Sequence, residues 1–303
     1  MYYGFRLRTS VPLPSLPALA GDGVPDLTLR RGVVPDRLPD AVWASPFVEI
    51  AIDGTVLVRI PNVVGFLVRG GCQLILDQDS DAETSVIETF LFGAVAGAVL
   101  HQRGILPLHA SCVMVGDIAV AMAGVSGRGK STLAGIMSLR GHEVVCDDIC
   151  AIGFHGGRAF VAPGPPRVRL WPDAAELLGL SHDGLQTARP NHPKRVLAAR
   201  GTDAATKPLG ALVRLGIDRR LQAPVIRRLA GPAAITPVEE LVYRARLGRR
   251  LDRRIGLFQD MARLATLVPI YQMVRPEGIV DPSLLVDLVA STVGGGGRDG
   301  ADG

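Results

Sequence analysis

The sequence predicts an α/β fold with a mixed β-sheet, preceded by a small β-rich unit. Three observations carry this prediction. A buried strand, a glycine-rich loop and a helix follow one another over 117–140, a hairpin precedes that loop, and a further short strand follows at 143–146. We place the β-rich unit at residues 1–80, the α/β domain at 81–293 and a flexible glycine-rich tail at 294–303.

The composition is that of a globular protein with a sizeable core. Of the 303 residues 48% are hydrophobic, and the net charge of +4 does not by itself demand nucleic acid, so we expect no nucleic-acid partner. The N-terminus has no apolar signal-peptide core. The longest apolar run, about 90–100, is shorter than the ~20 residues of a membrane span, and we interpret Gly93-x-x-x-Gly97 within it as close packing of a buried helix. We therefore expect a cytoplasmic protein without a membrane segment.

The cysteine spacing does not indicate a metal site or a disulfide framework. Cys72, Cys112, Cys146 and Cys150 form no C-x-x-C pair, and the surroundings of Cys146 and Cys150 offer too few further ligands for a metal. We expect buried, reduced thiols.

The N-terminal unit shows paired strand signals. Asp53-Gly54 separates strand-like stretches at 47–52 and 55–60, and Gly70-Gly71 separates apolar runs at 63–68 and 72–76. No catalytic constellation occurs here, which leaves substrate recognition or packing as its role. An acidic connector at 77–83 then leads into a helix predicted over 82–103.

The central motif is Gly124-Val125-Ser126-Gly127-Arg128-Gly129-Lys130-Ser131, which fits the P-loop pattern G-x-x-x-x-G-K-[ST] and is followed by Thr132. Glycines allow a tight loop whose backbone N–H groups point at phosphate oxygens. In such a loop Lys130 reaches the β- and γ-phosphates and the Ser131 hydroxyl holds Mg²⁺. The strand at 117–123 and the helix at 131–140, which stops at Gly141, supply the setting that the motif requires.

The strand before the loop predicts the position of a histidine. Gly116-Asp117 forms a two-residue turn that sets Val115 opposite Ile118. Counting back in this register, His109 lies opposite Gly124, beside the start of the loop. A core histidine bonded to backbone is the alternative.

Two aspartates end the strand at 143–146. A strand, loop, helix and strand of this length form a βαβ unit, so the new strand should run parallel in the same sheet. Ligands bind beyond the carboxyl ends of such strands, so Asp147 and Asp148 should face the γ-phosphate and Mg²⁺. One carboxylate can hold the metal with Ser131, for which we take Asp147, and the other can accept a proton from an attacking hydroxyl.

The rest of the chain carries cationic loops and further elements. An extended segment at 163–172 sets Arg167 and Arg169 on one side, and the stretch from Arg189 to Arg195 holds three cations that could clamp phosphate, bind an acidic peptide or simply be solvated. Helices are predicted at 173–180, 236–243, 257–267 and 281–293, and strands at 209–215, 224–229 and 269–274. Six arginines within 244–254 could form a nucleic-acid patch, but without interleaved aromatic residues we favour a solvated helical face.

Together these motifs resemble the HPr kinase/phosphorylase family, which joins a P-loop to an upstream histidine and a following R-G-H-x-x-x-x-D-D, here 140–148. The resemblance covers about residues 105–155. It implies a P-loop kinase core with a mixed sheet similar to that of phosphoenolpyruvate carboxykinase, ATP and Mg²⁺ as cofactors, transfer to a serine hydroxyl, and a possible homo-oligomer. By carry-over Lys130 binds phosphate, Asp148 accepts the proton, and His109 and Asp147 assist.

The chain departs from the family pattern after residue 160. No glycine-rich stretch with a glutamate ligand follows, so the resemblance favours a kinase without phosphorylase activity. The catalytic arginine is matched only loosely by Arg189 or Arg195, and we take Arg195 as the candidate. The layout of the whole chain is more similar to a branch that includes kinases of the C-terminal serine of lasso-peptide precursors, on the residues at 101–109, 169–173 and 194–195.

Three functions stay open on these residues. The first is an ATP-dependent serine kinase acting on a peptide or small protein, with a lasso-type precursor as best guess and an HPr-like protein as alternative. The second is a nucleotide-binding interaction protein with weak or no catalysis. The third is a small-molecule kinase, because a P-loop does not name the acceptor.

Overall fold

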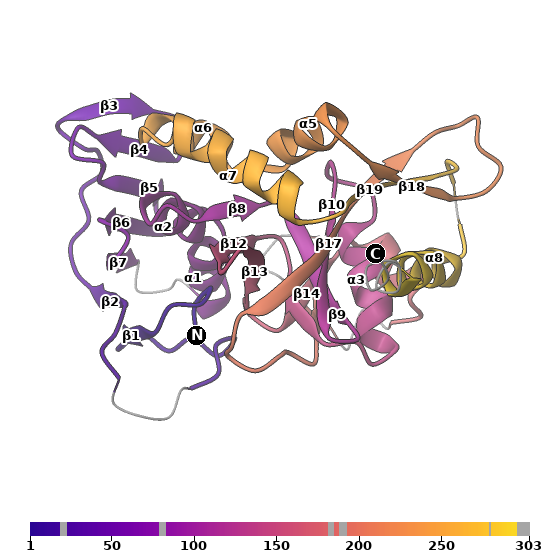
Figure 1. The fold of residues 1–303 in the computed structure, drawn as a ribbon. Helices are drawn as coiled ribbons and strands as arrows, with labels where there is room; N and C mark the ends of the chain where they lie inside the picture. Colours follow the sequence, from indigo (N-terminus) through magenta and orange to yellow (C-terminus); the bar gives the residue numbers. More distant parts are fainter. Residues whose placement is uncertain (19–22, 79–82, 181–184, 188–192, 279, 296–303) are drawn as a thin grey trace.

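The computed structural model describes residues 1–18, 23–78, 83–180, 185–187, 193–278 and 280–295. The expected tail lies almost entirely outside the described residues, as does most of the expected acidic connector. The chain forms a mixed α/β fold with two large sheets. The first sheet lies at one end of the molecule, and the second, which is curled, occupies its centre (Figure 1).

The first 80 residues supply a seven-stranded sheet of order β1-β2-β7-β6-β5-β4-β3. Its strands are β1 (Leu7–Thr9), β2 (Leu27–Arg31), β3 (Ala41–Ala44), β4 (Val48–Ala51), β5 (Val56–Ile60), β6 (Val64–Arg69) and β7 (Gln73–Gln78). The hairpin predicted at Asp53-Gly54 is confirmed, since β4 pairs antiparallel with β5 there. The two apolar runs that Gly70-Gly71 separates also pair antiparallel, as β6 and β7. All three glycines have positive φ, which suits these tight turns.

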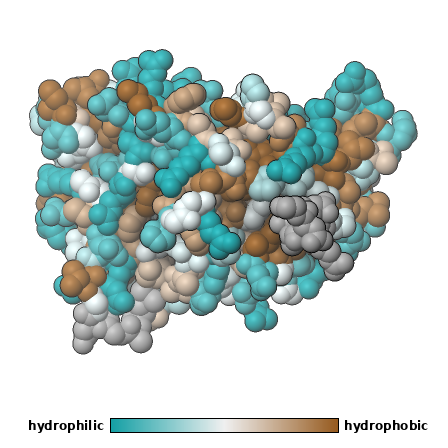
Figure 2. All heavy atoms as spheres, viewed as in Figure 1, coloured by the Kyte–Doolittle hydropathy of each residue, from teal (hydrophilic) through white to brown (hydrophobic). Residues whose placement is uncertain are grey.

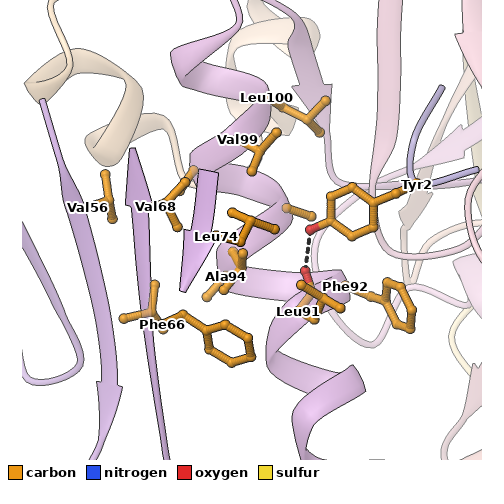
Figure 3. Packing of buried hydrophobic residues seen from close by; sticks show 14 of the residues in the cluster. Tyr2, Val56, Phe66, Val68, Leu74, Leu91, Phe92, Ala94, Val99 and Leu100 are labelled. Carbon is orange, nitrogen blue, oxygen red and sulfur yellow. Dashed lines mark hydrogen bonds between the residues drawn. The ribbon is translucent and has the colours of Figure 1, made fainter. Parts of the chain in front are cut away.

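The helical segment after this sheet covers one of its faces. It consists of α1 (Thr84–Phe90), a π-helical turn η1 (Leu91–Val95) and α2 (Ala96–Gln102), where the sequence predicted one uninterrupted α-helix. In the widened turn the Tyr2 hydroxyl donates to the Leu91 carbonyl at 2.6 Å, and the Tyr3 hydroxyl donates to the Phe92 carbonyl at 2.9 Å. Figure 3 shows apolar side chains of the sheet, such as Phe66, facing those of the helices. The segment is thus fixed from two sides, by the sheet and by the start of the chain.

The segment Thr84–Gln102 is long and apolar enough to cross a membrane by length and composition alone, and 72% of its apolar window is buried in the fold. A core helix passes the same length test, and here the segment packs into the main apolar cluster of the N-terminal sheet. The boundary predicted at residue 80 falls between this sheet and the helices that cover it.

The central sheet is mixed and follows the order β11-β9-β10-β17-β13-β12-β8, with β19 pairing to β17 and β18 to β19. Its strands are β8 (Leu106–Leu108), β9 (Ala110–Val115), β10 (Ile118–Ala123), β11 (Val144–Cys146), β12 (Cys150–His155), β13 (Arg158–Ala162), β17 (Lys207–Ile217), β18 (Val225–Leu229) and β19 (Ile270–Arg275). The predicted hairpin register is confirmed from Ile118↔Val115 to Ala123↔Ala110. Because β11 pairs antiparallel with β9, it runs parallel to β10 as predicted, but β9 lies between the two.

Helices cover both faces of this sheet. On one face α3 (Lys130–Leu139) and α8 (Pro282–Gly295) pack on Val120 and Met122 of β10. On the other, α5 (Pro232–Leu241) and α7 (Arg254–Leu267) pack on the alternating alanines of the same strand. The short helix α6 (Ala245–Arg250) joins α5 to α7.

The sequence prediction for α5 was wrong at both ends. The helix begins at Pro232, four residues before the predicted start, because Gly231 precedes a proline whose fixed φ suits the first helical position. It ends at Leu241, where Val242 and Tyr243 turn into extended contacts with the β8 region. A small sheet of β14 (Arg167–Leu170), β16 (Arg195–Ala198) and β15 (Gln186–Thr187), together with α4 (Pro172–Leu177), completes the described fold.

All four cysteines are free, and Cys112, Cys146 and Cys150 are buried, so the expected reduced state fits the structure. Burial raises the pKa of each of these three thiols well above its ordinary value. They are therefore neutral at pH 7, and neutral thiols are poor nucleophiles.

His101 is a buried titratable residue of the core. Its side chain has no solvent exposure, its Nε2 lies 2.9 Å from the Tyr243 carbonyl, and its Nδ1 has no partner. Burial lowers its pKa to about 4, so the ring stays neutral in the folded protein.

We predict that His101 makes stability fall in mild acid. Between pH 6.5 and about 4 His101 binds a proton in the unfolded chain but not in the folded protein. The contribution of the neutral ring to the free energy of unfolding is therefore complete above pH 6.5 and is lost as the pH falls towards 4. The loss amounts to about 3 kcal/mol. Urea unfolding across this range should show a smaller decline for His101→Gln than for the wild type, and an unchanged decline for the exposed His155→Gln. Parallel pH profiles for wild type and His101→Gln would contradict the assignment.

Candidate functional site

A cavity of about 540 Å³ opens where β10 leads into α3. The glycine loop, from Ser126 to Thr132, forms part of the lining, and His109, Asp148 and Arg169 line the cavity as well. A third part is apolar and is contributed by α3, α4, α8 and their neighbours: Leu133, Ile136, Leu170, Leu177 and Leu285. The cavity therefore offers backbone donors, charges and an apolar wall within one volume.

The loop adopts conformations that need glycine. Gly127 and Gly129 have φ of 82° and 94°, in the left-handed region that L side chains rarely adopt. Gly124 has φ of 146°, and a Cβ there would lie 2.9 Å from the carbonyl oxygen of Leu215. The loop ends at α3, whose first turn receives no side-chain cap. An uncapped helix N-terminus with its positive dipole end suits an anion.

Lys130 folds back over the loop. Its Nζ donates to the Gly124 carbonyl at 2.8 Å, and the residue is only 7% exposed. Burial lowers the pKa of Lys130, while the negative charges of Asp148 and Asp147 oppose that shift. The ammonium thus lies against the loop, where the charges of the two carboxylates act on it.

Asp147 binds the hydroxyls of two serines. Its Oδ1 accepts from Ser111 at 2.6 Å and from Ser131 at 3.1 Å, and its Oδ2 accepts from the backbone N–H of Arg169 at 2.9 Å. Because Ser131 donates its proton to the carboxylate, its oxygen lone pairs remain available to a cation. Mg²⁺ in phosphate sites commonly uses few protein ligands and completes its shell with phosphate and water, so this donor set fits it. Among the described residues, no group of three or more His, Cys, Asp or Glu side chains has metal-ligating geometry.

Asp148 points into the cavity instead, and its backbone turns at φ of 76°, which is unusual for a residue with a side chain. Its carboxylate forms an ion pair with Arg169, and His109 Nδ1 lies 3.5 Å from its Oδ1. Burial works to raise the pKa of Asp148, but Arg169, His109 and Lys194 outweigh it and the pKa lies below its ordinary value. The group is therefore a charged, hydrogen-bond-accepting carboxylate at pH 7.

His109 is bonded to backbone as well as close to Asp148. Its Nδ1 lies 3.0 Å from the Asp148 carbonyl oxygen, and its ring lies 5.9 Å from that of Tyr243 between centroids. Burial lowers the pKa of His109, against the charge of Asp148, so the ring is neutral at pH 7. Since a carbonyl can only accept, Nδ1 carries the proton and Nε2 keeps a free lone pair.

The structure brings His109, Lys130, Ser131, Asp147 and Asp148 together, but Arg195 is not among the residues that line the cavity. Arg195 lies in β16, paired in register with Leu170 and Thr187. Arg189, the other arginine considered from the sequence, lies outside the described residues.

Among the described residues, the cations that line the cavity outside the glycine-loop motif are Arg169, Lys194 and Arg275. The alternation of Arg167 and Arg169 in an extended segment indicated that both share a face, but not what that face meets. In the fold Arg169 binds Asp148, whereas Arg167 turns away to Glu88 at 3.3 Å and to the ring of Phe92 at 4.8 Å.

Comparison with known proteins gives a structural likeness but no match at the level of sequence families. No family model matches this chain, and no curated protein matches it. The chain is similar to the Hpr(Ser) kinase/phosphatase from Coxiella burnetii, with a TM-score of 0.34 and 15% sequence identity over 64% of this chain and 94% of that chain. A likeness of this degree leaves the function to be argued from the site itself.

We predict that Arg169 stabilises the fold through Asp148. Replacing Arg169 by Met would leave a carboxylate that is only 19% exposed without its cation, so the free energy of unfolding at pH 7 should fall by roughly 3 kcal/mol. The double variant Arg169→Met/Asp148→Asn should recover part of that loss. Urea unfolding measures both.

The matched control for this prediction is Arg140→Met. It removes the ion pair of Arg140 with Asp287, whose side chains are 37% and 70% exposed, and it should lower stability by less than about 1 kcal/mol. Equal losses for Arg169→Met and Arg140→Met would show that Asp148 does not depend on Arg169.

Proposed function

We propose that this protein is an ATP-dependent phosphotransferase that phosphorylates a serine hydroxyl of a peptide or small protein. The single observation that carries the proposal is the division of the two aspartates. Asp147 binds the Ser131 hydroxyl at the start of α3, and Asp148 faces the cavity beside the glycine loop. The resemblance of the sequence motifs to HPr kinase/phosphorylase supports the same reaction class.

The triphosphate would lie along the glycine loop. The loop N–H groups and the start of α3 would bind phosphate oxygens, and Lys130 would exchange the Gly124 carbonyl for a phosphate oxygen. Ser131, oriented by Asp147, would hold Mg²⁺, whose charge stabilises the negative charge of the triphosphate. The apolar wall of the cavity offers room for an apolar part of either substrate.

Transfer would use Asp148 as the proton acceptor. The acceptor oxygen attacks the γ-phosphorus, its proton passes to the Asp148 carboxylate, the new O–P bond forms, and the bond between the γ-phosphorus and the β,γ-bridging oxygen breaks to release ADP. The partners of Asp148 favour its charged form, so it stands ready to accept a hydrogen bond from the hydroxyl. Arg169 and Lys194, which also line the cavity, would balance charge that develops at the phosphoryl group.

The acceptor class is the finer part of the proposal. We take a peptide serine as acceptor, with the C-terminal serine of a ribosomal lasso-type precursor as best guess and an HPr-like protein as alternative. Both follow from the sequence resemblance. Peptides encoded beside the gene are the first acceptors to test.

We predict that Asp148→Asn binds ATP but loses phosphoryl transfer. The amide cannot take the hydroxyl proton, so turnover should fall by about 10²- to 10⁴-fold. Lys130→Ala should instead weaken ATP binding by roughly 10- to 100-fold, since a charge-assisted hydrogen bond is lost. Calorimetry with ATP and transfer of labelled phosphate to candidate peptides separate the two effects. Normal turnover by Asp148→Asn would exclude it as the base, and ATP binding unaffected by Lys130→Ala would remove the loop from the site.

A further inference from the structure

A surface rich in arginine covers α6 and the start of α7. Positions 244–263 contain seven arginines and only two acidic residues, Asp252 and Asp260. Asp260 is already paired with Arg253 at 2.8 Å. The other arginines of this stretch are exposed, and we call the four on α6 and at the start of α7 the arginine surface: Arg246, Arg249, Arg250 and Arg254.

The charges of the arginine surface are not balanced within the fold. Across the part of the chain that the structure describes, no ion pair involves any of its four members, although many other arginines are paired. These unpaired arginines differ from a solvated helix face, on which acidic and basic side chains usually alternate and pair. A large field of one sign attracts a partner of the opposite sign.

Two large apolar side chains lie next to these arginines. Ile255 is 74% exposed and Phe258 is 60% exposed, one turn apart on α7. Over α6 and the start of α7 the surface is mainly hydrophilic, with hydrophobic spheres among the polar ones (Figure 2). A partner that matches this surface must therefore offer both carboxylates and apolar side chains.

The arginine surface connects to the candidate site through the segment between α5 and α6. The His109 N–H donates to the Leu241 carbonyl at 2.7 Å, and the Tyr243 ring packs on the His109 ring. Arg244, the next residue, lies with its guanidinium 5.7 Å from the Tyr243 ring centroid, and α6 begins directly after it. A bound peptide that lies along α6 would therefore have one end near Tyr243 and His109, and His109 is next to Asp148.

We propose that the arginine surface docks an acidic, partly apolar peptide segment of the molecule that is phosphorylated. Its carboxylates would pair with the arginines, and its apolar side chains would cover Ile255 and Phe258. A peptide is favoured over other anions because the surface pairs charge with aliphatic and aromatic contacts and continues to Asp148. The identity of this segment as part of the acceptor rests on the proposed function, whereas the docking itself does not.

Binding without nucleotide tests the docking. The probe is a fluorescein-labelled synthetic peptide of repeated Glu-Glu-Leu with a C-terminal serine, followed by fluorescence anisotropy. Arg249→Glu/Arg250→Glu should weaken its binding by roughly tenfold or more, because attraction is replaced by like-charge repulsion. The matched control is Arg227→Glu/Arg228→Glu on β18, which makes the same change in net charge at the other end of the molecule (Figure 1). Its effect should stay within about twofold, since distant charges are screened.

The apolar part of the docking has its own control. Ile255→Ser/Phe258→Ser should weaken binding of the probe peptide several-fold. Leu284→Ser, which removes a 53% exposed side chain from α8, should leave that binding unchanged. Equal losses for the arginine variant and its β18 control would overturn the proposal, because they would show an effect of net charge alone. Preferential binding of a single-stranded RNA or of anionic vesicles over the peptide at the arginine surface would also overturn it.

The kinetics separate this proposal from the proposed function. With a peptide that the protein phosphorylates, Arg249→Glu/Arg250→Glu should raise KM by roughly tenfold and leave kcat unchanged. Unchanged KM would overturn the docking while leaving the kinase intact. Docking of the probe without phosphate transfer to any serine peptide would support the docking and reject the kinase.

Discussion

The site depends on two adjacent, partly buried carboxylates that follow β11 and on the groups that pair with each of them. Burying a charge costs several kcal/mol unless it is paired and hydrogen-bonded. Asp147 is satisfied by two serine hydroxyls and a backbone N–H, and Asp148 pairs with the Arg169 guanidinium and lies 3.5 Å from His109 Nδ1. Arg169 serves both, with its backbone N–H for Asp147 and its side chain for Asp148. The left-handed φ of Asp148 turns the carboxylates apart, so that one meets Ser131 and the other meets the cavity.

Both aspartates bind Arg169 of β14, and the same strand also contacts the helices that cover the N-terminal sheet. Arg167, two residues before Arg169, reaches Glu88 of α1 and the ring of Phe92 in the π-helical turn. Tyr2 and Tyr3 bind the carbonyls of that same turn, and Tyr3 is fully buried near Cys146 and Gly164. The first 80 residues therefore contribute packing behind the carboxylates, one of the two roles that elimination left open from the sequence.

Local sequence signals predicted local geometry well. A two-residue turn defines a hairpin register by itself, so the pairing of β9 with β10 could be counted from Val115 and Ile118. The glycines of the loop indicated a tight turn, and Gly127 and Gly129 adopt left-handed backbone there. The π-helical turn was not predicted, and the tyrosine hydroxyls that bind its carbonyls lie 89 residues earlier in the chain, beyond the reach of a local sequence pattern. Arg195 was taken as the candidate catalytic arginine from the family resemblance, but it does not line the cavity, whereas Arg169 does. Strand pairing decides which side chain of a cationic segment faces inward.

The sequence by itself determined the mixed α/β fold class, the glycine loop between a strand and a helix, and the two aspartates one βα unit later. Each of these follows from short-range constraints on φ, hydrogen bonding and apolar periodicity. Only the tertiary structure decided that Asp147 binds Ser131 while Asp148 faces the cavity with Arg169, and that the arginines of α6 remain unpaired beside Ile255 and Phe258. Those outcomes depend on which charged side chains, distant in sequence, come into contact when the helices and strands pack. The spacing of residues along the chain does not determine these contacts.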